Sequence, residues 1–342
     1  MIGPARSVHG GISGVVNNYY DAGLHKKIEL CYIGTMVEGS KLRKLWQAFF
    51  ALCLFGCKLP FYEIVHVNVA SDASFVRKSF FIRLAKLFGK RIVIHQHGGD
   101  FEGYYGQLGE SAKEKVRRIL SMGDAFLVLA PAYQAFFQEI TGREDIVVFP
   151  DAIEIPDAFE KEYGEQKILF LGRLCKAKGI GELLQAMKNL HESYPHAKLY
   201  LGGIWEDKEL EEQVATFGEY VIPLGWISGE EKRKYLQECD IFALPSYFEG
   251  QSVAILEAMA YQCAIMASDV GGIPQMIIQN ETGLLVEPED AVSLQKSLER
   301  VLSDKKFCRS LGEQARTKVE QEFSMEQNME KLLSVYEEVL SK

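Results

Sequence analysis

Two glutamates, Glu249 and Glu257, lie eight positions apart in the segment of the chain that carries most chemical information. Glu249 falls in a short loop after an apolar run (240–245), and Glu257 falls in a helical pattern that begins near Gln251 or Ser252. The N-terminus of a helix offers unpaired N–H groups and a positive dipole end, which together bind phosphate. Carboxylates on both sides of a phosphate site suit a nucleotide sugar, because one can accept from sugar hydroxyls and the other from ribose hydroxyls. Two solvated surface acids would give the same spacing.

Two cations follow another apolar run (167–172). Arg173 comes directly after it, and Lys178 stands five positions later, before Gly179. Cations in a loop between strand and helix can neutralise a diphosphate, and glycine lets the loop turn tightly. The segment lacks the P-loop pattern, and the sequence has no Asp-x-Asp pair, with which many sugar transferases hold a metal. We therefore expect neither a metal nor a cofactor at this site.

Glycines and histidines give two weaker signals. Gly10 and Gly11 would let the backbone approach a ligand, although an ordinary turn has the same composition. His95 and His97 alternate at the end of a strand-like run, so their side chains point to one side. Together with Asp100 they could bind a metal, which is the basis of a rival hypothesis, a metallohydrolase. A single ligand-facing histidine, His97, is the favoured interpretation, because α/β sheets bind ligands at the carboxyl ends of their strands.

Strands and helices must alternate along nearly the whole chain to position these residues. The strand-like runs are short and apolar on both faces: 28–34, 63–69, 91–97, 125–130, 145–150, 167–172, 198–203, 220–225, 240–245 and 264–268. Helical patterns lie between them, which predicts an α/β fold with parallel sheets covered by helices. An acidic, proline-containing stretch (150–166) separates two similar halves, and the tail (325–342) predicts one amphipathic helix. Only two residues precede Gly3, so we expect the true N-terminus to lie upstream of Met1.

The two halves differ in charge. Up to Pro150 the chain has 18 Lys and Arg against 13 Asp and Glu, a net +5, whereas the remainder has 20 against 34, a net −14. The total of −9 argues against a nucleic-acid partner, which normally requires a basic surface. Seven scattered cysteines without a C-x-x-C pair and the lack of a signal-peptide core predict a cytoplasmic protein. The most apolar stretch (46–57) is shorter than the ~20 residues of a membrane span.

Taken in order, these motifs resemble the retaining glycosyltransferases of family 4 (glycosyl transferases group 1), which have the GT-B fold. The resemblance covers nearly the whole chain through HGGIS, HQHGGDF, FLGRLCKAKGIGELLQAM, LGWISGEEKRKYLQECDIFALPS, EGQSVAILEAMA, SDVGGIPQMI and NETGLLVEPED. It implies two Rossmann-like domains whose parallel sheets face each other across a cleft. The implied boundaries are an acceptor-binding domain (1–152), a nucleotide-sugar-binding domain (153–324) and a C-terminal helix (325–342) that returns to the first domain.

The resemblance also implies roles for single residues on the matching motifs. Arg173 and Lys178 would hold the diphosphate and stabilise its departure. Glu249 would bind the donor sugar, and Glu257 the ribose hydroxyls. His97 would lie at the sugar, beside the reaction centre.

Further donor-binding positions implied by the resemblance come from two loops: Gly10, Gly11, Gly250, Gln251, Ser252 and Val253. Gly11 would let the N-terminal loop close on the phosphates, and backbone amides near Ser252 would cap the β-phosphate. The chain departs from the family pattern where EGQS replaces EGFG or EGLP, at Gln275, where an acid is frequent, and at Asp151-Ala152, where Asn-Gly is common. None of these departures removes a residue assigned to the diphosphate.

The implied reaction moves a hexose-type sugar, with retained configuration, from a nucleotide sugar such as a UDP-sugar to a glycan acceptor. We expect a polyprenyl-linked acceptor, as in bacterial capsule, exopolysaccharide or O-antigen synthesis. Basic, aromatic segments (41–62, 75–91 and 113–118) predict peripheral attachment to an anionic membrane surface on the inner face of the cell membrane, although ordinary solvated helices share this composition. The alternatives are a GT-B nucleotide-sugar epimerase or hydrolase, a non-catalytic binding protein, and the metallohydrolase centred on His95 and His97.

Overall fold

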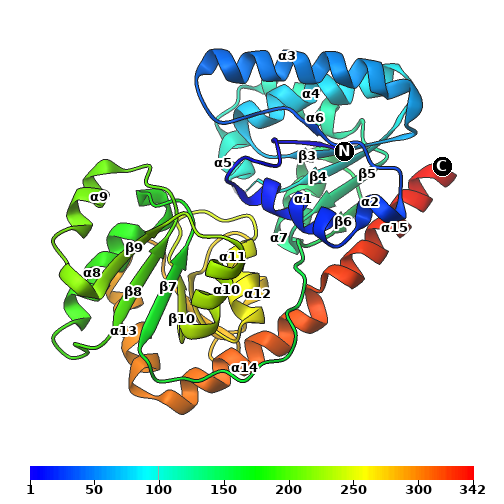
Figure 1. Cartoon of the computed structure of the whole chain (residues 1–342). Helices are drawn as coiled ribbons and strands as arrows, with labels where there is room; N and C mark the ends of the chain where they lie inside the picture. The colour runs from blue at the N-terminus through cyan, green and yellow to red at the C-terminus, as the bar shows by residue number, and fades with distance from the viewer. Residues whose placement is uncertain (99) are drawn as a thin grey trace. The chain divides into compact units, whose positions relative to one another are not determined.

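The chain forms two units, each built around one six-stranded parallel sheet (Figure 1). The structure is a computed structural model and describes residues 1–98 and 100–342. The first unit comprises Met1–Glu154 together with Ser324–Lys342, and the second comprises Ile155–Phe323. This architecture confirms the predicted α/β class.

The first sheet has the strand order β2-β1-β3-β4-β5-β6. Its strands, in chain order, are β1 (Ile2–Gly3), β2 (Ile33–Gly34), β3 (Ile64–Val69), β4 (Arg91–Gln96), β5 (Ala125–Val128) and β6 (Ile146–Val148). Ile92, Val93 and Ile94 are all fully buried, because both faces of β4 are covered. Coverage on both faces explains why the strands appear in the sequence as continuous apolar runs rather than alternating ones.

The run 28–34 was expected to be a full strand, but only its end, β2, joins the sheet. The reason lies in its partner, because β1 offers only Ile2 and Gly3, which pair with Ile33 and Gly34. A ladder of hydrogen bonds extends only as far as both strands do. Before β2, the Cys31 carbonyl oxygen still accepts from the Met1 amino group at 2.7 Å, but the paired register of the two strands begins only at Ile33.

Helices cover both faces of the first sheet (Figure 1). They are α1 (Gly11–Asp21), α2 (Leu24–Lys27), α3 (Lys41–Lys58), α4 (Asp72–Leu87), α5 (Phe101–Gly106), α6 (Glu110–Leu120), α7 (Pro131–Thr141) and α15 (Met325–Ser341). Val65 and Val67 of β3 pack into the core beneath α3 and α4, whereas His66 between them bonds Tyr336 of α15. The alternation of side chains along a strand thus gives β3 one apolar face and one polar face.

The second sheet has the strand order β12-β11-β10-β7-β8-β9. Its strands are β7 (Lys167–Leu171), β8 (Lys198–Gly202), β9 (Val221–Gly225), β10 (Ile241–Leu244), β11 (Ala264–Ser268) and β12 (Gly283–Val286). Strand β12 was not among the predicted strands, because it is only a four-residue apolar segment inside the motif NETGLLVEPED. It lies at the edge of the sheet, where it pairs with β11 from Ile265 onward.

The second unit also carries helices around its sheet. They are α8 (Ile180–Leu190), α9 (Lys208–Val214), α10 (Gly229–Glu238), α11 (Val253–Ala260), α12 (Ile273–Met276), α13 (Ala291–Ser303) and α14 (Lys305–Glu322). The stretch before β7, which the sequence marks as a break, is tied to this unit. Lys161 donates to the carbonyls of Leu236 and Tyr261, and the Tyr163 hydroxyl donates to the carbonyl of Gln262.

Candidate active site

The second sheet reverses its winding between β7 and β10. From β7 the chain adds strands toward β9, and from β10 it adds strands in the other direction, toward β12. Ligands of open α/β sheets bind outside the carboxyl ends of the strands at such a switch point. The loops that follow β7 and β10 carry Arg173, Lys178 and Glu249, so the fold brings together two motifs that lie about 70 positions apart in the sequence.

The two loops touch through backbone. Gly179 has a φ of +71°, and a Cβ at this position would lie 1.9 Å from the carbonyl oxygen of Pro245. One step further, the amide of Tyr247 donates to the carbonyl oxygen of Ala177 at 3.0 Å. Only glycine meets both the left-handed conformation and the close approach, so Gly179 fixes the distance between the loops.

This approach places Lys178 against Glu249. The Lys178 Nζ lies 2.5 Å from Glu249 Oε1, and the Ser246 hydroxyl donates to the same oxygen at 3.0 Å. The side chains are 17% and 11% exposed, so solvent screens the pair only in part. A cation assigned to the diphosphate and a carboxylate assigned to the sugar therefore stand side by side on neighbouring loops.

The other two assigned residues have partners that the sequence did not reveal. Arg173 Nη1 lies 3.1 Å from Glu206 Oε2, and the Arg173 side chain is 53% exposed. Glu257 Oε1 accepts from Lys232 Nζ, on α10, at 2.6 Å. Glu206 lies outside the motifs quoted above and Lys232 lies inside one of them, but no local spacing links either residue to its partner.

Helix α11 begins two residues after Gln251, close to the predicted start. Ser252 occupies the N-cap position but makes no side-chain capping bond in the described part of the chain. The Ser252 side chain thus does not cap the first amides of the helix, and a helix terminus of this kind suits an anion. Gly250 and Gln251 lead into this terminus, and Val253 is the first residue of the helix.

In the first unit, Gly10 and Gly11 stand at the start of α1, in the connection from β1 to β2. A Cβ at either position would meet no described atom within 4 Å. The fold of the first unit therefore does not itself demand glycine at these positions. Their assignment to the donor phosphates stays a prediction.

His97 follows β4 and is enclosed within the first unit. Its side chain is 2% exposed, its Nε2 lies 2.9 Å from Asn68 Oδ1, and its Nδ1 lies 3.2 Å from Asp151 Oδ1. Sequence analysis noted Asp151 only as a departure from the family pattern. No local spacing links Asp151 to His97, because they lie on different strand ends.

The residue set predicted for the rival metal centre is wrong in one member. Asp100 does not join the two histidines, because its side chain caps α5 by accepting from the amide of Gly103. The acid that lies near His95 and His97 is Asp151, and their side-chain N and O atoms lie within 4.8 Å of one another. Burial, followed by the nearby His97 and His66, holds the pKa of His95 well below its ordinary value, so His95 is neutral at pH 7.

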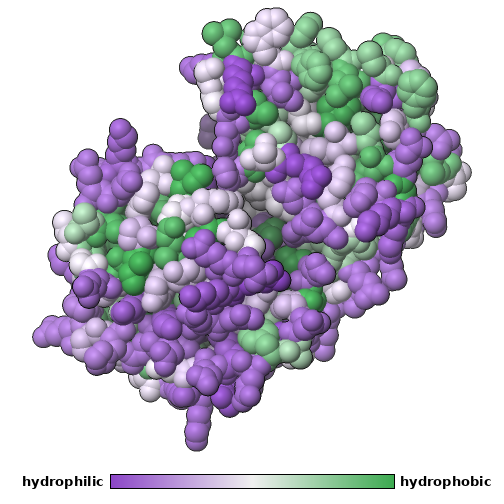
Figure 2. Space-filling view, viewed as in Figure 1, coloured by the Kyte–Doolittle hydropathy of each residue, from purple (hydrophilic) through white to green (hydrophobic). Residues whose placement is uncertain are grey.

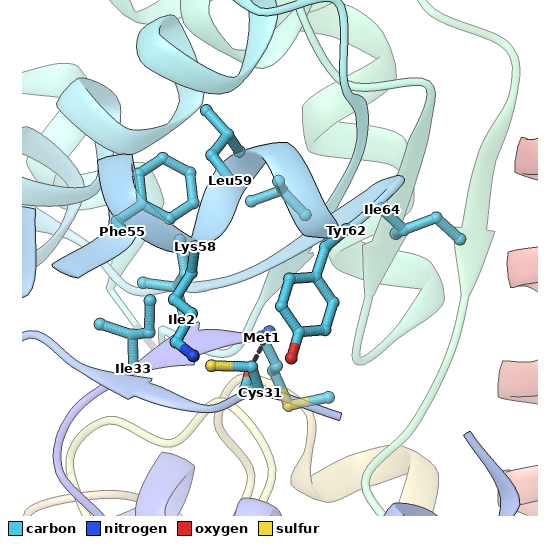
Figure 3. A pocket seen from close by; sticks show the side chains of 10 residues that line it. Met1, Ile2, Cys31, Ile33, Phe55, Lys58, Leu59, Tyr62 and Ile64 are labelled. Carbon is cyan, nitrogen blue, oxygen red and sulfur yellow. Dashed lines mark hydrogen bonds between the residues drawn. The ribbon is translucent and has the colours of Figure 1, made fainter. Parts of the chain in front are cut away.

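An apolar hollow in the first unit lies apart from these residues (Figure 3). Ile2, Ile33 and Phe55 contribute to its wall, with Tyr62 and Lys58 at its side. None of the candidate residues lines it. Its lining is typical of incompletely filled core beneath the end of α3 rather than of a site for a charged donor.

Residues 151–318 match the family model of the glycosyl transferases group 1. The matched residues cover nearly all of the second unit, Ile155–Phe323. Among curated relatives, an enzyme of Campylobacter jejuni is 30% identical to this chain over 226 residues. Its name is GalNAc-α-(1→4)-GalNAc-α-(1→3)-diNAcBac-PP-undecaprenol α-1,4-N-acetyl-D-galactosaminyltransferase. That match covers 63% of this chain and 60% of the relative. The first four curated relatives are matched over 44% to 64% of their length.

Solved structures share the fold of the whole chain. Sucrose-phosphate synthase from Thermosynechococcus elongatus has a TM-score of 0.79 at 21% identity, with 99% of this chain and 98% of that chain covered. The Anabaena protein HepE in complex with UDP and glucose has a TM-score of 0.77 at 15% identity, with 98% of each chain covered. These likenesses confirm the predicted GT-B fold.

Proposed function

We propose that the protein is a retaining, metal-independent glycosyltransferase of polysaccharide synthesis, with a nucleotide sugar as donor and a lipid-linked glycan as acceptor. The observation that carries this proposal is the Lys178–Glu249 pair at the switch point of the second sheet. It joins a diphosphate-binding cation to a hydroxyl-binding carboxylate beside a helix N-terminus.

Donor binding exchanges partners at this site. When the diphosphate of the donor binds Lys178, it replaces Glu249 as the partner of the ammonium group. The Glu249 carboxylate can then accept hydrogen bonds from hydroxyls of the sugar. Arg173 can leave Glu206 at small cost, because an exposed ion pair is worth about 0–1 kcal/mol. The site is therefore held in shape by the charges that the donor later engages.

The chemical step breaks the bond between C1 of the sugar and the β-phosphate oxygen. Negative charge grows on the leaving diphosphate, where Lys178, Arg173 and the first amides of α11 stabilise it. The acceptor hydroxyl forms the new bond to C1 on the same face, and its proton passes to the departing diphosphate. This route retains the configuration at C1 and requires neither an enzymatic nucleophile nor a metal.

The comparisons support the choice of donor and acceptor. The Campylobacter relative acts on a glycan carried by undecaprenyl diphosphate, as its name states, and HepE binds UDP and glucose. Another relative, from Staphylococcus aureus, is a capsular polysaccharide biosynthesis glycosyltransferase. We infer that this chain uses a UDP-sugar and a polyprenyl-linked acceptor.

The surface of α3 supports membrane attachment of the first unit. Leu42, Leu45, Trp46, Phe49 and Phe50 are 59% to 70% exposed. Figure 2 shows apolar side chains among hydrophilic ones over the part of the view where Figure 1 draws α3 and α4. Large side chains in such number are seldom left in water unless they meet another surface.

The charges around this surface favour an anionic lipid layer as the partner. Helix α3 contains Lys41, Arg43, Lys44 and Lys58 and no acidic residue. Cations that flank exposed aromatic side chains are typical of helices lying in the membrane interface. Among the described residues, no helix is long and apolar enough to cross a bilayer. We therefore propose peripheral attachment through α3, on the cytoplasmic face where nucleotide sugars are available.

The reaction is tested by a thermal-shift screen with UDP-, GDP- and ADP-sugars, followed by transfer to a polyprenyl-diphosphate-linked glycan. We expect stabilisation by one donor class, transfer that EDTA leaves unchanged, and an axial or equatorial product linkage that matches the donor by NMR. Turnover that EDTA abolishes would support the metallohydrolase instead. An inverted linkage would rule out the same-face mechanism.

Membrane attachment is tested by liposome flotation at low salt. We expect binding to vesicles that contain phosphatidylglycerol and little binding to phosphatidylcholine alone. The double variant Trp46→Ala/Phe50→Ala should lose most of this binding. Trp226→Ala, which removes an exposed aromatic side chain from the second unit, serves as the matched control. Equal binding by the double variant and the control would exclude α3 as the attachment site.

A further inference from the structure

Lys78 lies in the core-facing stripe of α4, at a position where the period of the helix predicts an apolar residue. The other members of this stripe, Phe75, Ile82 and Ala85, belong to the apolar core of the first unit. Lys78 is enclosed with them, and only 1% of its surface is exposed. A lysine that is almost wholly removed from water is rare unless other groups compensate its charge.

The described residues offer this ammonium group little compensation. The Lys78 Nζ donates to the Ser74 hydroxyl at 2.9 Å, a neutral acceptor one helical turn earlier. Burial, followed by the neighbouring cation Arg77, lowers the pKa of Lys78 to about 7. No acidic residue offsets these two effects among the residues that the structure describes.

A second cation, Arg77, lies directly beside the first in the sequence. It is partly buried, and its Nε donates to Thr35 Oγ1 at 3.4 Å. Thr35 is itself fully buried and donates its hydroxyl to the carbonyl oxygen of Gly3 at 2.9 Å. Within residues 1–98 and 100–342, the two cations thus have hydroxyl oxygens as their recorded acceptors and no carboxylate. Buried charges in proteins are normally paired, so this arrangement indicates a missing anion.

Both cations reach the carboxyl end of the first sheet. Gly3 is the last residue of β1, and Thr35 directly follows β2. Helix α4 connects the parallel strands β3 and β4, so it begins at this end and runs back along the sheet. Side chains of a helix lean toward its N-terminus, which directs the Lys78 ammonium toward Ser74. Ligands of α/β sheets bind at this end.

A buried lysine with a purely structural role is bonded differently in this protein. In the second unit, the ammonium group of Lys161 donates to the carbonyls of Leu236 and Tyr261 and lies 3.2 Å from the Cys263 sulfur. These three atoms match the three donors of an ammonium group. Lys78 uses one donor on an acceptor in the described part of the chain, which leaves donor capacity for a ligand.

We propose that Lys78 and Arg77 bind a phosphoryl group of the sugar acceptor at the carboxyl end of the first sheet. A phosphoryl group matches the two positive charges, and the planar guanidinium of Arg77 can bind two of its oxygens. The flexible side chain of Lys78 exchanges the Ser74 hydroxyl for a phosphate oxygen, and Ser74 is itself only partly buried, so this exchange is open to solvent. The anion site is a property of the first unit alone. Its assignment to the acceptor rests on the proposed function, in which the acceptor carries a diphosphate.

Anion binding is tested on the full chain by isothermal titration calorimetry with inorganic pyrophosphate as the probe. The titrations use the Arg173→Ala/Lys178→Ala variant, which lacks the two cations assigned to the donor diphosphate. We expect about one pyrophosphate per chain in this variant, and binding at least about tenfold weaker when Lys78→Met or Arg77→Gln is added. Absence of binding in the starting variant, or equal binding after both additions, overturns the proposal.

The matched controls come from the same helix. Lys86→Met and Arg83→Gln remove exposed cations of α4 by the same exchanges, and each should leave pyrophosphate binding unchanged. Weakening by the controls as strong as that by Lys78→Met would assign the effect to the net charge of the helix and overturn the proposal. Circular dichroism confirms that each variant is folded.

The assignment to the acceptor is tested by transfer kinetics in the otherwise wild-type chain. We expect Lys78→Met to raise KM for a polyprenyl-diphosphate-linked acceptor at least about tenfold, while KM for the donor changes less than about twofold. An unchanged KM for the acceptor overturns this assignment. Absence of transfer in the wild type would count against the proposed function and leave the pyrophosphate result standing.

Liposome flotation separates the acceptor from a membrane lipid as the source of the phosphoryl group. If the site serves the acceptor, Lys78→Met should bind vesicles that contain phosphatidylglycerol as well as the wild type does. Loss of this binding in Lys78→Met, with binding retained in Lys86→Met, would assign the site to a lipid headgroup and overturn the proposal.

Discussion

In the second unit the paired charges of the site keep contact with solvent, whereas in the first unit the pair is enclosed. The side chains of Lys178 and Glu249 are 17% and 11% exposed, and that of Arg173 is 53% exposed, against 2% and 4% for His97 and Asp151. Charged side chains near solvent can exchange partners when a ligand binds, because water solvates them while they are unpaired. An enclosed pair cannot exchange at comparable cost. The side chains of the second unit's site can thus change partners when an anion binds, whereas the enclosed side chains of the first unit keep theirs.

Two buried lysines show a related difference. Lys161, in the second unit, donates to the carbonyls of Leu236 and Tyr261 at 2.9 and 2.8 Å and lies 3.2 Å from the Cys263 sulfur. Lys78, on α4 in the first unit, has Ser74 Oγ as the one acceptor recorded among the described residues. The number of hydrogen-bond acceptors decides whether a buried ammonium group stabilises or destabilises the folded state.

The largest expected effect comes from breaking the partly buried Lys178–Glu249 pair of the second unit. Lys178→Ala and Glu249→Ala should each lower the transfer rate about 10³-fold, or about 4 kcal/mol, because a preorganised charge at the reacting groups is lost. The check is kcat under saturating donor, with the circular dichroism spectrum unchanged. Lys176→Ala, in the same loop, is the control and should keep a rate near that of the wild type. Rates within tenfold of wild type in both site variants would contradict the assignment.

The next largest effect concerns the contact between the two loops of that site. Gly179→Ala should lower the free energy of unfolding by about 3 kcal/mol, because the new Cβ meets the Pro245 carbonyl in a left-handed backbone conformation. Urea unfolding measures the change. Gly181→Ala is the control, since its Cβ meets no described atom within 4 Å and α8 should gain up to about 1 kcal/mol. Equal stability of the two variants would show that the loops part easily.

The two buried lysines should respond in opposite directions. Lys161→Met leaves two buried carbonyls without a donor and should destabilise by about 2 kcal/mol. Lys78→Met should stabilise by about 2 kcal/mol at pH 7, because burial, followed by nearby Arg77, lowers the pKa of Lys78 to about 7.

The pH dependence of stability distinguishes the effect of the Lys78 charge from an effect of packing. Between about pH 7 and the ordinary lysine pKa of 10.5, the unfolded chain binds the Lys78 proton more tightly than the folded chain, so stability rises with pH. Lys78→Met should therefore gain most below pH 7 and flatten this part of the profile. Urea unfolding at pH 6.5, 8 and 9.5 measures it. A gain that is constant with pH would mean that packing, not charge, is responsible.

The smallest effect concerns Arg173. Glu206→Ala removes its exposed partner and should change the free energy of unfolding by less than about 0.5 kcal/mol. Because Arg173 is then free of competition, KM for the donor should fall slightly or stay constant. A large rise in KM would show that Glu206 orients Arg173 rather than restrains it.

The grouping of candidate residues could be predicted from the sequence more readily in the second unit than in the first. Arg173, Lys178 and Glu249 lie in continuous motifs beside strands, so their spacing carried the information. Asp151 pairs with His97 across two strand ends, and its sequence neighbours give no sign of this. Burial of Lys78 and Lys161 is equally invisible locally, because it depends on which helices cover them.

The fold was predicted well where strands are long and apolar, and poorly where partners limit them. The run 28–34 has the composition of a strand throughout, yet β1 offers it only two residues to pair with. Conversely, β12 is too short to stand out from its motif and becomes a strand because β11 is beside it. Strand pairing depends on two segments, so the composition of one segment alone does not predict how far a strand extends.

The chain leaves the first unit after Glu154 and re-enters it at Ser324, which forms a bridge with Ile153. The amide of Met325 also donates to the carbonyl oxygen of Ile153 at 2.8 Å. The second unit is therefore an insertion whose entry and exit points are adjacent. Such an arrangement allows recombination to replace the whole second unit while the first sheet and its last helix keep their pairing. Chimeras joined at these two positions would exchange the second unit without cutting either sheet.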